Sequence, residues 1–232
     1  SKEVSKLITI QEGCDKFCSF CVVPYTRGAE FSRSVENIYA ETIALVKNGA
    51  KELTLLGQNV SSYESNVIKD GIRKKIKLGD LCQILSHIQG LERIRYLTSH
   101  PIDIDDNLLD QHKKNPKLMP FLHLPIQSGS DRILKKMNRK HSKVFYLNLI
   151  EKIKNIKKNM AFSSDFIVGY PGETDKDFQE SLEVIEKVRF ASSYSFKYSP
   201  RPGTPSSLQD SLIDDSVVDM RLREMQSILN KH

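Results

Sequence analysis

The sequence predicts an α/β fold, an incomplete (β/α)6 TIM-like barrel with parallel strands inside and helices outside. Short apolar runs alternate with amphipathic stretches six times along the 232 residues, which is typical of a parallel sheet covered by helices. Six β/α units are fewer than the eight that close a TIM barrel, so an open barrel is expected. A polar or Gly/Pro-rich segment follows each predicted strand, and chemistry in such folds takes place at the carboxyl ends of the strands.

Six segments are predicted to be strands because they are short, are rich in β-branched, leucine or aromatic residues, and are mostly bounded by turn residues. They are LITIQ (7–11), LTLLGQ (53–58), RIRYLTS (93–99), FLHLPIQ (121–127), SSDFIVGY (163–170) and YSFKYS (194–199). The segments at their carboxyl ends are GCDKFCSFC, GQN, SHP, QSGS, GYPGE and SPRPGTPS. We therefore expect these six segments on one rim of the sheet.

Helices are predicted between the strands, several of them with recognisable N-caps. Ser34 and Ser142 are suited to cap the helices that follow them, and Thr174 with Asp177 three residues later forms a capping-box pattern. The predicted helices are about 34–48, from 80, about 104–114, from 142, from 174, and about 215–230. The charged stretch 61–79 is expected to be an irregular surface insertion.

The composition is ordinary for a globular protein, with 39% hydrophobic and 28% charged residues. No apolar stretch approaches the roughly 18 residues of a membrane span and no segment resembles a signal peptide, so no membrane partner is expected. The net charge of +6 weakly favours a polyanionic partner such as nucleic acid. Four cysteines, three of them clustered, do not form a disulfide framework and indicate a reducing, cytoplasmic location.

The cysteine cluster is the strongest chemical signal in the sequence. Cys14, Cys18 and Cys21 lie in GCDKFCSFC at the spacing C-x3-C-x2-C, with the aromatic Phe20 before the last cysteine. Structural zinc takes four ligands, and the fourth cysteine, Cys82, lies in a predicted helix where it is better explained as a buried apolar residue. Three thiolates on an iron–sulfur cubane leave one iron open to a small molecule. A zinc site completed by a histidine is the alternative.

The spacing and the segments around it resemble those of radical S-adenosylmethionine (SAM) enzymes, and in particular the methylthiotransferase family. The matching stretches are GCDKFCSFCVVPYTRGAEFSRS, LLGQNVSSY, RIRYLTSHP, FLHLPIQSGSDRILKKMNR, SSDFIVGYPGET and YSFKYSPRPGTPS, which follow in order over essentially the whole chain. The resemblance implies a barrel of the radical SAM type. The motifs VVPYTRG and LLGQN are similar to the branch that acts on isopentenyl-adenosine.

The resemblance implies an enzyme that converts isopentenylated adenosine beside the tRNA anticodon to its 2-methylthio derivative. A 4Fe-4S cluster on Cys14, Cys18 and Cys21 would bind SAM at its open iron and cleave it to a radical. The alternatives are threonylcarbamoyl-adenosine in tRNA or an aspartate of a ribosomal protein as the substrate. A non-catalytic RNA-binding or zinc module is a further alternative, but it does not explain motifs at the ends of six strands.

The resemblance also implies partners and a domain arrangement. The partners would be tRNA and a reducing electron donor such as flavodoxin or ferredoxin, with the protein a monomer. Residues 1–232 correspond to the central radical SAM core domain. The family's N-terminal domain with a second 4Fe-4S cluster and its C-terminal TRAM domain, a small β-barrel that grips tRNA, are expected to lie outside this chain. We therefore expect the chain to cleave SAM without completing methylthiolation.

The contacts with SAM are implied by the same resemblance, and no catalytic residue is assigned beyond the cluster. Strand-end polar groups would bind the amino, carboxylate and ribose groups, and a strand backbone would bind the adenine. The predicted cofactor-binding residues are Phe20, Gln58, Asn59, Ser99, Gln127, Ser128, Arg139, Asp165, Ile167, Val168 and Gly169.

Each of these assignments has a purely structural alternative. Gln58 and Asn59 could only satisfy backbone groups, and the SGSD segment that contains Ser128 could only cap the helix that begins near Asp131. Asp165 lies in an apolar strand and needs a partner, either a ribose hydroxyl or a basic neighbour such as Arg139. His100 and His123 are expected to be structural, the first through a hydrogen bond and the second as a core or barrel-lining residue.

Overall fold

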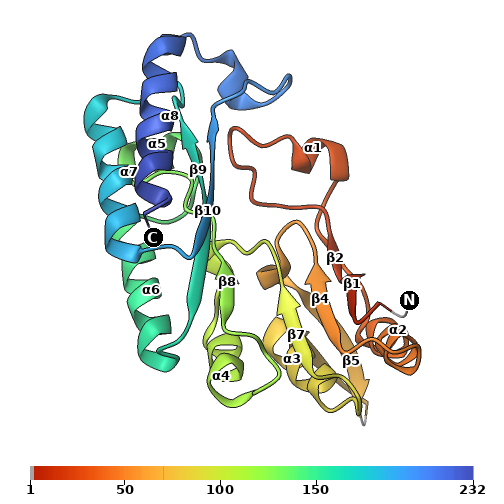
Figure 1. Cartoon of the computed structure of the whole chain (residues 1–232). Coiled ribbons are helices and arrows are strands. Elements are labelled where there is room, and N and C mark those ends of the chain that lie inside the picture. The colour runs from red at the N-terminus through yellow and green to blue at the C-terminus, as the bar shows by residue number, and fades with distance from the viewer. Residues whose placement is uncertain (1–2, 70, 232) are drawn as a thin grey trace.

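A computed structural model describes residues 3–69 and 71–231 of the chain. Two three-stranded parallel sheets, with strand orders β1-β4-β7 and β10-β9-β8, form the inner layer (Figure 1). Their strands are β1 (Ser5–Thr9), β4 (Glu52–Leu56), β7 (Arg93–Tyr96), β8 (Phe121–His123), β9 (Ala161–Val168) and β10 (Ser192–Lys197). An isolated bridge joins Ile94 of β7 to Leu118 in the segment before β8, and within the described residues no pairing joins β1 to β10. The predicted open six-stranded α/β barrel is confirmed.

Helices cover the outside of both sheets, and α6, α7 and α8 lie together against β9 and β10 (Figure 1). The helices are α1 (Val23–Arg27), α2 (Val35–Lys47), α3 (Leu78–Ser86), α4 (Asp106–Lys114), α5 (Asp131–Lys136), α6 (Lys143–Ile156), α7 (Asp175–Val188) and α8 (Asp215–Leu229). The core lies between sheets and helices, where Leu55, Ile94 and Phe166 are fully buried. Each such side chain contributes about 1.5–3 kcal/mol of hydrophobic stabilisation.

The predicted N-caps are present and explain where the long helices begin. Ser34 Oγ accepts a hydrogen bond from the N–H of Asn37, and Ser142 Oγ accepts one from Phe145. Thr174 and Asp177 form the predicted capping box at the start of α7. These bonds satisfy backbone donors that have no partner within the helix.

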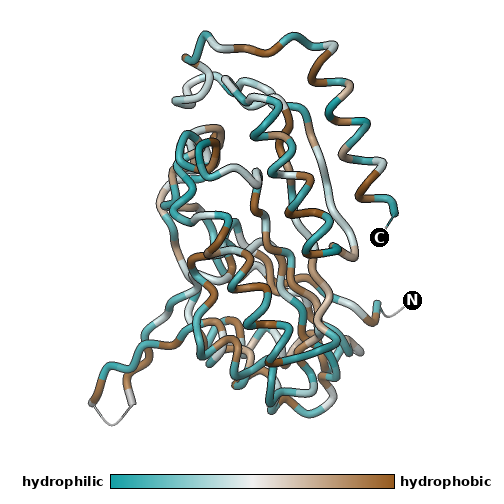
Figure 2. Tube along the Cα trace, turned by 90° about the vertical axis from the view of Figure 1, so that its left-hand side faces the viewer, coloured by the Kyte–Doolittle hydropathy of each residue, from teal (hydrophilic) through white to brown (hydrophobic). Residues whose placement is uncertain are grey.

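The prediction that 61–79 is irregular is wrong. A short 3₁₀ helix, Val60–Ser62, leads into an antiparallel hairpin of β5 (Glu64–Lys69) and β6 (Ile72–Lys77), which projects from the body of the protein (Figure 2). Ile76 is buried at the base of the hairpin, while Ile68 is exposed. Asp70 lies outside the described residues, and Gly71 has a φ of 74°. A two-residue Asp-Gly connection is a hairpin signal, which charge and apparent irregularity obscured.

Two further short strands were not predicted: β2 (Gln11–Glu12) and β3 (Phe31–Ser32), which pair antiparallel on either side of the cysteine loop. Within the described ranges, every helix is too short or too polar to cross a bilayer.

Candidate functional site

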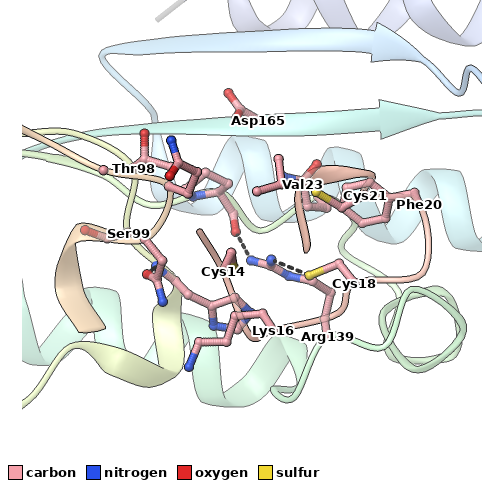
Figure 3. Close-up of a pocket in the computed structure, with 16 residues that line it drawn as sticks. Cys14, Lys16, Cys18, Phe20, Cys21, Val23, Thr98, Ser99, Arg139 and Asp165 are labelled. Carbon is pink, nitrogen blue, oxygen red and sulfur yellow. Dashed lines mark hydrogen bonds between the residues drawn. The ribbon is translucent and has the colours of Figure 1, made fainter. Parts of the chain in front are cut away.

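A cavity of about 350 Å³ opens at the carboxyl ends of the strands (Figure 3). It lies on the rim that the sequence predicted, and ten of the fourteen predicted metal and cofactor residues line it. These ten are Cys14, Cys18, Phe20, Cys21, Gln58, Asn59, Ser99, Gln127, Arg139 and Asp165. Ser128, Ile167, Val168 and Gly169 are not among the residues that line it.

The cysteine loop is fixed at its start by Gln11 and Gly13. The buried Gln11 side chain donates from Nε2 to the Gly13 carbonyl over 2.8 Å and accepts at Oε1 from the Asn59 N–H over 3.1 Å. Gly13 has a φ of 70°, and a Cβ at this position would lie 2.1 Å from the Ala29 carbonyl oxygen. Only glycine fits here, because both the backbone angle and the contact exclude a side chain.

The other side of the loop is anchored to the second half of the barrel. The Ser19 N–H donates to the Met137 carbonyl over 2.9 Å, and Ser19 Oγ lies 2.8 Å from both the Lys136 carbonyl oxygen and Tyr170 Oη. The loop therefore bridges the β1-β4-β7 half and the β8-β9-β10 half of the barrel, and the three thiols face the cavity between them.

The three thiols fit a cluster better than a single ion. Among residues 3–69 and 71–231, no three histidine, cysteine, aspartate or glutamate side chains gather closely enough to hold one metal ion. This argues against the zinc alternative, which needs four donors around one centre. In an iron–sulfur cubane, by contrast, each thiolate binds a different iron and the sulfurs stand farther apart. Soft thiolates are the donors that iron–sulfur clusters select.

Burial raises the pKa of the Cys14 and Cys21 thiols, because desolvation disfavours the thiolate. A metal cluster bound at these positions would favour the thiolate form. Cys82 is fully buried in α3, away from the cavity, and burial raises its pKa to about 12. The prediction that Cys82 is a core residue is confirmed.

Two buried side-chain oxygens of the cavity lack hydrogen-bond partners in the described structure. Gln58 Oε1 and Ser99 Oγ are buried without a hydrogen bond. An unsatisfied buried polar group costs about 1–3 kcal/mol, so these oxygens are suited to a polar ligand.

The Asn59 side chain, in contrast, forms hydrogen bonds within the protein through both its nitrogen and its oxygen. Its Nδ2 donates to Asp103 over 2.7 Å, and its Oδ1 accepts from the His100 N–H over 2.9 Å. Asp103 also accepts from Lys16, which lines the cavity, over 2.7 Å. Neither Lys16 nor Asp103 was predicted, because 87 residues separate them and no local pattern reveals their pairing.

Gln127 lines the cavity, whereas the adjacent Ser128 does not. Gln127 lines the cavity with a φ of 76°, and its backbone pairs with both Asp165 and Ile167. Ser128 is turned away into the protein, where it accepts from the Ser130 N–H over 3.2 Å. The structure therefore places Ser128 in the turn before α5 and not in the cavity wall.

Ser130 Oγ accepts from the Ile133 N–H at the start of α5. The alternative reading of the SGSD segment as a helix cap is therefore confirmed.

Asp165 has a partner that was not predicted. Its Oδ2 lies 3.4 Å from Nε2 of His123, whose Nδ1 lies 2.7 Å from Ser163 Oγ. His123 is thus a barrel-lining residue, as expected. Arg139 instead contacts the Cys18 sulfur and the Pro125 carbonyl oxygen, so the suggested Arg139–Asp165 pair is wrong.

Two backbone N–H groups of the predicted adenine-binding strand already donate hydrogen bonds within the protein. The Ile167 N–H donates to the Gln127 carbonyl over 2.9 Å, and the Gly169 N–H donates to Glu173 Oε2 over 3.0 Å. These two donors have no remaining capacity for a base, because each N–H makes one strong hydrogen bond. Val168 is buried, and Ile167 and Phe20 both pack against the buried cluster of Ile133, Met137 and Tyr170.

His100 is structural, as predicted. Its Nδ1 accepts from the Ile102 N–H over 3.3 Å. Burial lowers its pKa to about 2, with the Arg139 charge as a smaller cause, so the ring is neutral near pH 7.

Comparison with known proteins is consistent with this geometry. A family model described as the radical SAM superfamily matches residues 8–185. The chain belongs to the radical SAM superfamily. Enzymes of this superfamily use a 4Fe-4S cluster and SAM. One solved structure of similar fold is described with a [4Fe-4S] cluster and cobalamin, and another with SAM and cobalamin.

Curated relatives agree with the predicted methylthiotransferase resemblance. A Bartonella tribocorum protein is 56% identical over 226 residues, which is 97% of this chain and 49% of that protein. A Rickettsia typhi protein is 53% identical over 225 residues, which is 97% of this chain and 50% of that protein. Both are named tRNA-2-methylthio-N(6)-dimethylallyladenosine synthase. The chain spans about half the length of these relatives.

Solved radical SAM enzymes share the fold. The methyltransferase TsrM from Kitasatospora setae superposes with a TM-score of 0.68 at 13% identity, over 89% of this chain and 38% of that chain. Methylornithine synthase superposes with a TM-score of 0.62 at 17% identity, over 97% of this chain and 62% of that chain. At these identities the likeness establishes the fold alone.

Proposed function

We propose that this chain is the SAM-cleaving core of a tRNA methylthiotransferase that acts on isopentenylated adenosine beside the anticodon. The observation that carries the proposal is the three-cysteine loop facing a cavity at the carboxyl ends of the strands. The relatives named above support the substrate, because their identity of 53–56% extends over 97% of this chain.

Cys14, Cys18 and Cys21 would hold a 4Fe-4S cluster, and the remaining iron would bind SAM. When bound, the cluster and SAM supply a reductive cleavage that yields 5′-deoxyadenosine. The chain's own residues orient the cofactor and exclude water. Gln58 Oε1 and Ser99 Oγ are free acceptors that suit the amino group of SAM, and Phe20 forms an apolar wall.

The partners follow from the same proposal. The substrate is tRNA, and the net charge of +6 favours a polyanion. The electron donor is a small redox protein such as flavodoxin or ferredoxin, and the protein works as a monomer in the cytoplasm. We place the second 4Fe-4S domain and the TRAM domain in the half of the relatives' length that this chain does not span.

Anaerobic reconstitution with iron and sulfide tests the core function. We expect about four irons per chain and 5′-deoxyadenosine from SAM under a strong reductant, without methylthiolated product. Cys14→Ala should abolish SAM cleavage, whereas Cys82→Ala, which alters a cysteine outside the cavity, should retain it. Bound zinc in place of iron, or unchanged cleavage in Cys14→Ala, would contradict the proposal.

The substrate is tested separately in a strain that lacks the full-length protein. We expect loss of 2-methylthio-isopentenyl-adenosine from its tRNA. If that nucleoside persists while the methylthio derivative of threonylcarbamoyl-adenosine or of a ribosomal-protein aspartate is lost, one of the alternative substrates is correct.

A further inference from the structure

Arg139 is a buried cation without a carboxylate partner in the described structure. Only 9% of the residue is exposed. Its Nη2 donates to the Pro125 carbonyl over 2.5 Å, its Nη1 lies 3.4 Å from Cys18 Sγ, and its Nε is buried with no partner. Asp165, the carboxylate of the same cavity, pairs with His123 instead. A buried charge needs compensation, so this guanidinium requires an anion.

The backbone around Arg139 is fastened to the cysteine loop. The Arg139 N–H donates to the Leu134 carbonyl over 2.9 Å, and the preceding Asn138 takes a left-handed φ of 56°. Asn138 Nδ2 donates to the Phe17 carbonyl over 2.7 Å, one residue before Cys18. The turn that follows α5 therefore holds the guanidinium in place before any ligand arrives.

The side chain points from this turn between the Cys18 sulfur and the Pro125 carbonyl (Figure 3). Nη1 and Nη2 each use one N–H on the protein, and the Nη1 donor is directed at the cysteine sulfur. Because a guanidinium carries five N–H donors, others remain for a ligand. The contact with Cys18 therefore gives Arg139 a role toward the cysteine sulfur in addition to the predicted SAM contact.

We propose that Arg139 is a positioning residue that supplies the counter-charge of the cluster through Cys18 and raises its reduction potential. The inference rests on the proposed function, because it requires a cluster on the three cysteines. The thiolates and the cluster core together carry net negative charge, which grows by one unit when an external reductant donates one electron. The Arg139 charge and its N–H···S hydrogen bond stabilise the more negative state. No proton moves in this step.

A redox titration of the reconstituted chain without SAM tests this. The cluster would be titrated with dithionite and mediators and followed by electron paramagnetic resonance. For Arg139→Met, we expect the ratio of reduced to oxidised cluster at a fixed potential to fall at least tenfold, which is about 59 mV for a one-electron couple. Arg139→Lys keeps the charge but loses the planar guanidinium. Its ratio of reduced to oxidised cluster should lie between those of the wild type and Arg139→Met.

Lys135→Met is the matched control, because it removes an exposed cation from the same segment. Its midpoint potential should equal that of the wild type. An unchanged midpoint in Arg139→Met with full iron content would overturn the inference. If Arg139→Met and Arg139→Lys both fold but hold no iron, Arg139 serves cluster assembly and the inference on the potential is also overturned. A wild-type chain that binds no iron would instead refute the proposed function.

Discussion

Lys16 Nζ lies 2.7 Å from Asp103 Oδ1, and this contact joins the cysteine loop to the segment after β7. The same carboxylate accepts from Asn59 Nδ2 over 2.7 Å through its second oxygen. Both members of the ion pair are mostly buried, with 21% and 18% of their side chains exposed. The Asp103 carboxylate thus joins two polar side chains, Lys16 and Asn59, which both line the cavity and which follow β2 and β4.

Asp103→Ala should lower the free energy of unfolding by about 1–3 kcal/mol, because it leaves Lys16 and Asn59 without their acceptor. Denaturant unfolding of the metal-free chain measures this. Iron content after reconstitution should also fall, because the cysteine loop loses its anchor. Asp110→Ala removes an exposed carboxylate paired with Lys114 and should leave both quantities unchanged. Equal stability of the two variants would contradict the anchoring role.

Gly13→Ala should abolish cluster binding. The added Cβ would meet the Ala29 carbonyl oxygen at 2.1 Å, and the backbone would be held at an unfavourable φ of 70°. Gly71→Ala is the matched control, because Gly71 has a φ of 74° but nothing within 4 Å of an added Cβ, and it lies in the hairpin away from the cysteines. Iron content should therefore be lost in the first variant and largely kept in the second. Similar iron content in both would mean that the close contact at Gly13 is not required.

Glu173 follows β9 and forms a buried ion pair with Arg221. This carboxyl should make the free energy of unfolding depend on pH. Its Oε2 accepts from Arg221 over 2.9 Å and from the Gly169 N–H over 3.0 Å. Burial raises the pKa of this carboxyl above 4.5, although both hydrogen bonds act in the opposite direction. Between pH 4.5 and the raised pKa the folded state binds more protons than the unfolded state, so this group destabilises the fold as the pH rises.

The free energy of unfolding of the wild type minus that of Glu173→Gln should therefore decrease as the pH rises through this range. Chemical denaturation at a series of pH values measures it. The free energy of unfolding of the wild type minus that of Asp177→Asn should instead increase as the pH rises. Burial acts to raise the pKa of Asp177, but hydrogen bonds from Arg132, Ser130 and Thr174 together lower it. The stability that Asp177 contributes is lost as the pH falls below 3.8 and through its lowered pKa. Parallel slopes for the two variants would contradict this assignment.

Local patterns predicted the parts of the fold that depend on local physics. The caps Ser34, Ser142 and Thr174 and the six strands were predictable, because a cap needs only a side chain and the N–H groups two or three residues ahead. The β5–β6 hairpin was missed although the sequence carries the turn signal Asp-Gly at positions 70 and 71, since charged residues on β6 hide the strand pattern.

Pairings between distant segments were not predictable in the same way. Arg139 and Cys18 are 121 residues apart, and the partner of Asp165 is 42 positions before it, at His123. The sequence predicted Cys18 in the loop after the first strand and His123 and Asp165 within the fourth and fifth strands, but only the three-dimensional arrangement decides which side chains meet. The separation of Gln127 from Ser128 likewise depends on the left-handed φ of Gln127, which turns the next residue away from the cavity.

Ser99 and Ser128 provide a paired test of which polar groups meet SAM. Ser99 Oγ lines the cavity and has no hydrogen-bond partner, whereas Ser128 Oγ accepts from Ser130 and lies away from the cavity. Ser99→Ala should weaken SAM binding to the reconstituted chain by about tenfold, the effect of one hydrogen bond of about 1.4 kcal/mol, without lowering stability. Ser128→Ala should leave SAM binding unchanged and destabilise the fold by about 1 kcal/mol. Equilibrium binding of SAM and denaturant unfolding measure the two quantities on the same preparations. The reverse result, in which Ser128→Ala alone weakens SAM binding, would mean that the turn before α5 reorients toward the cofactor.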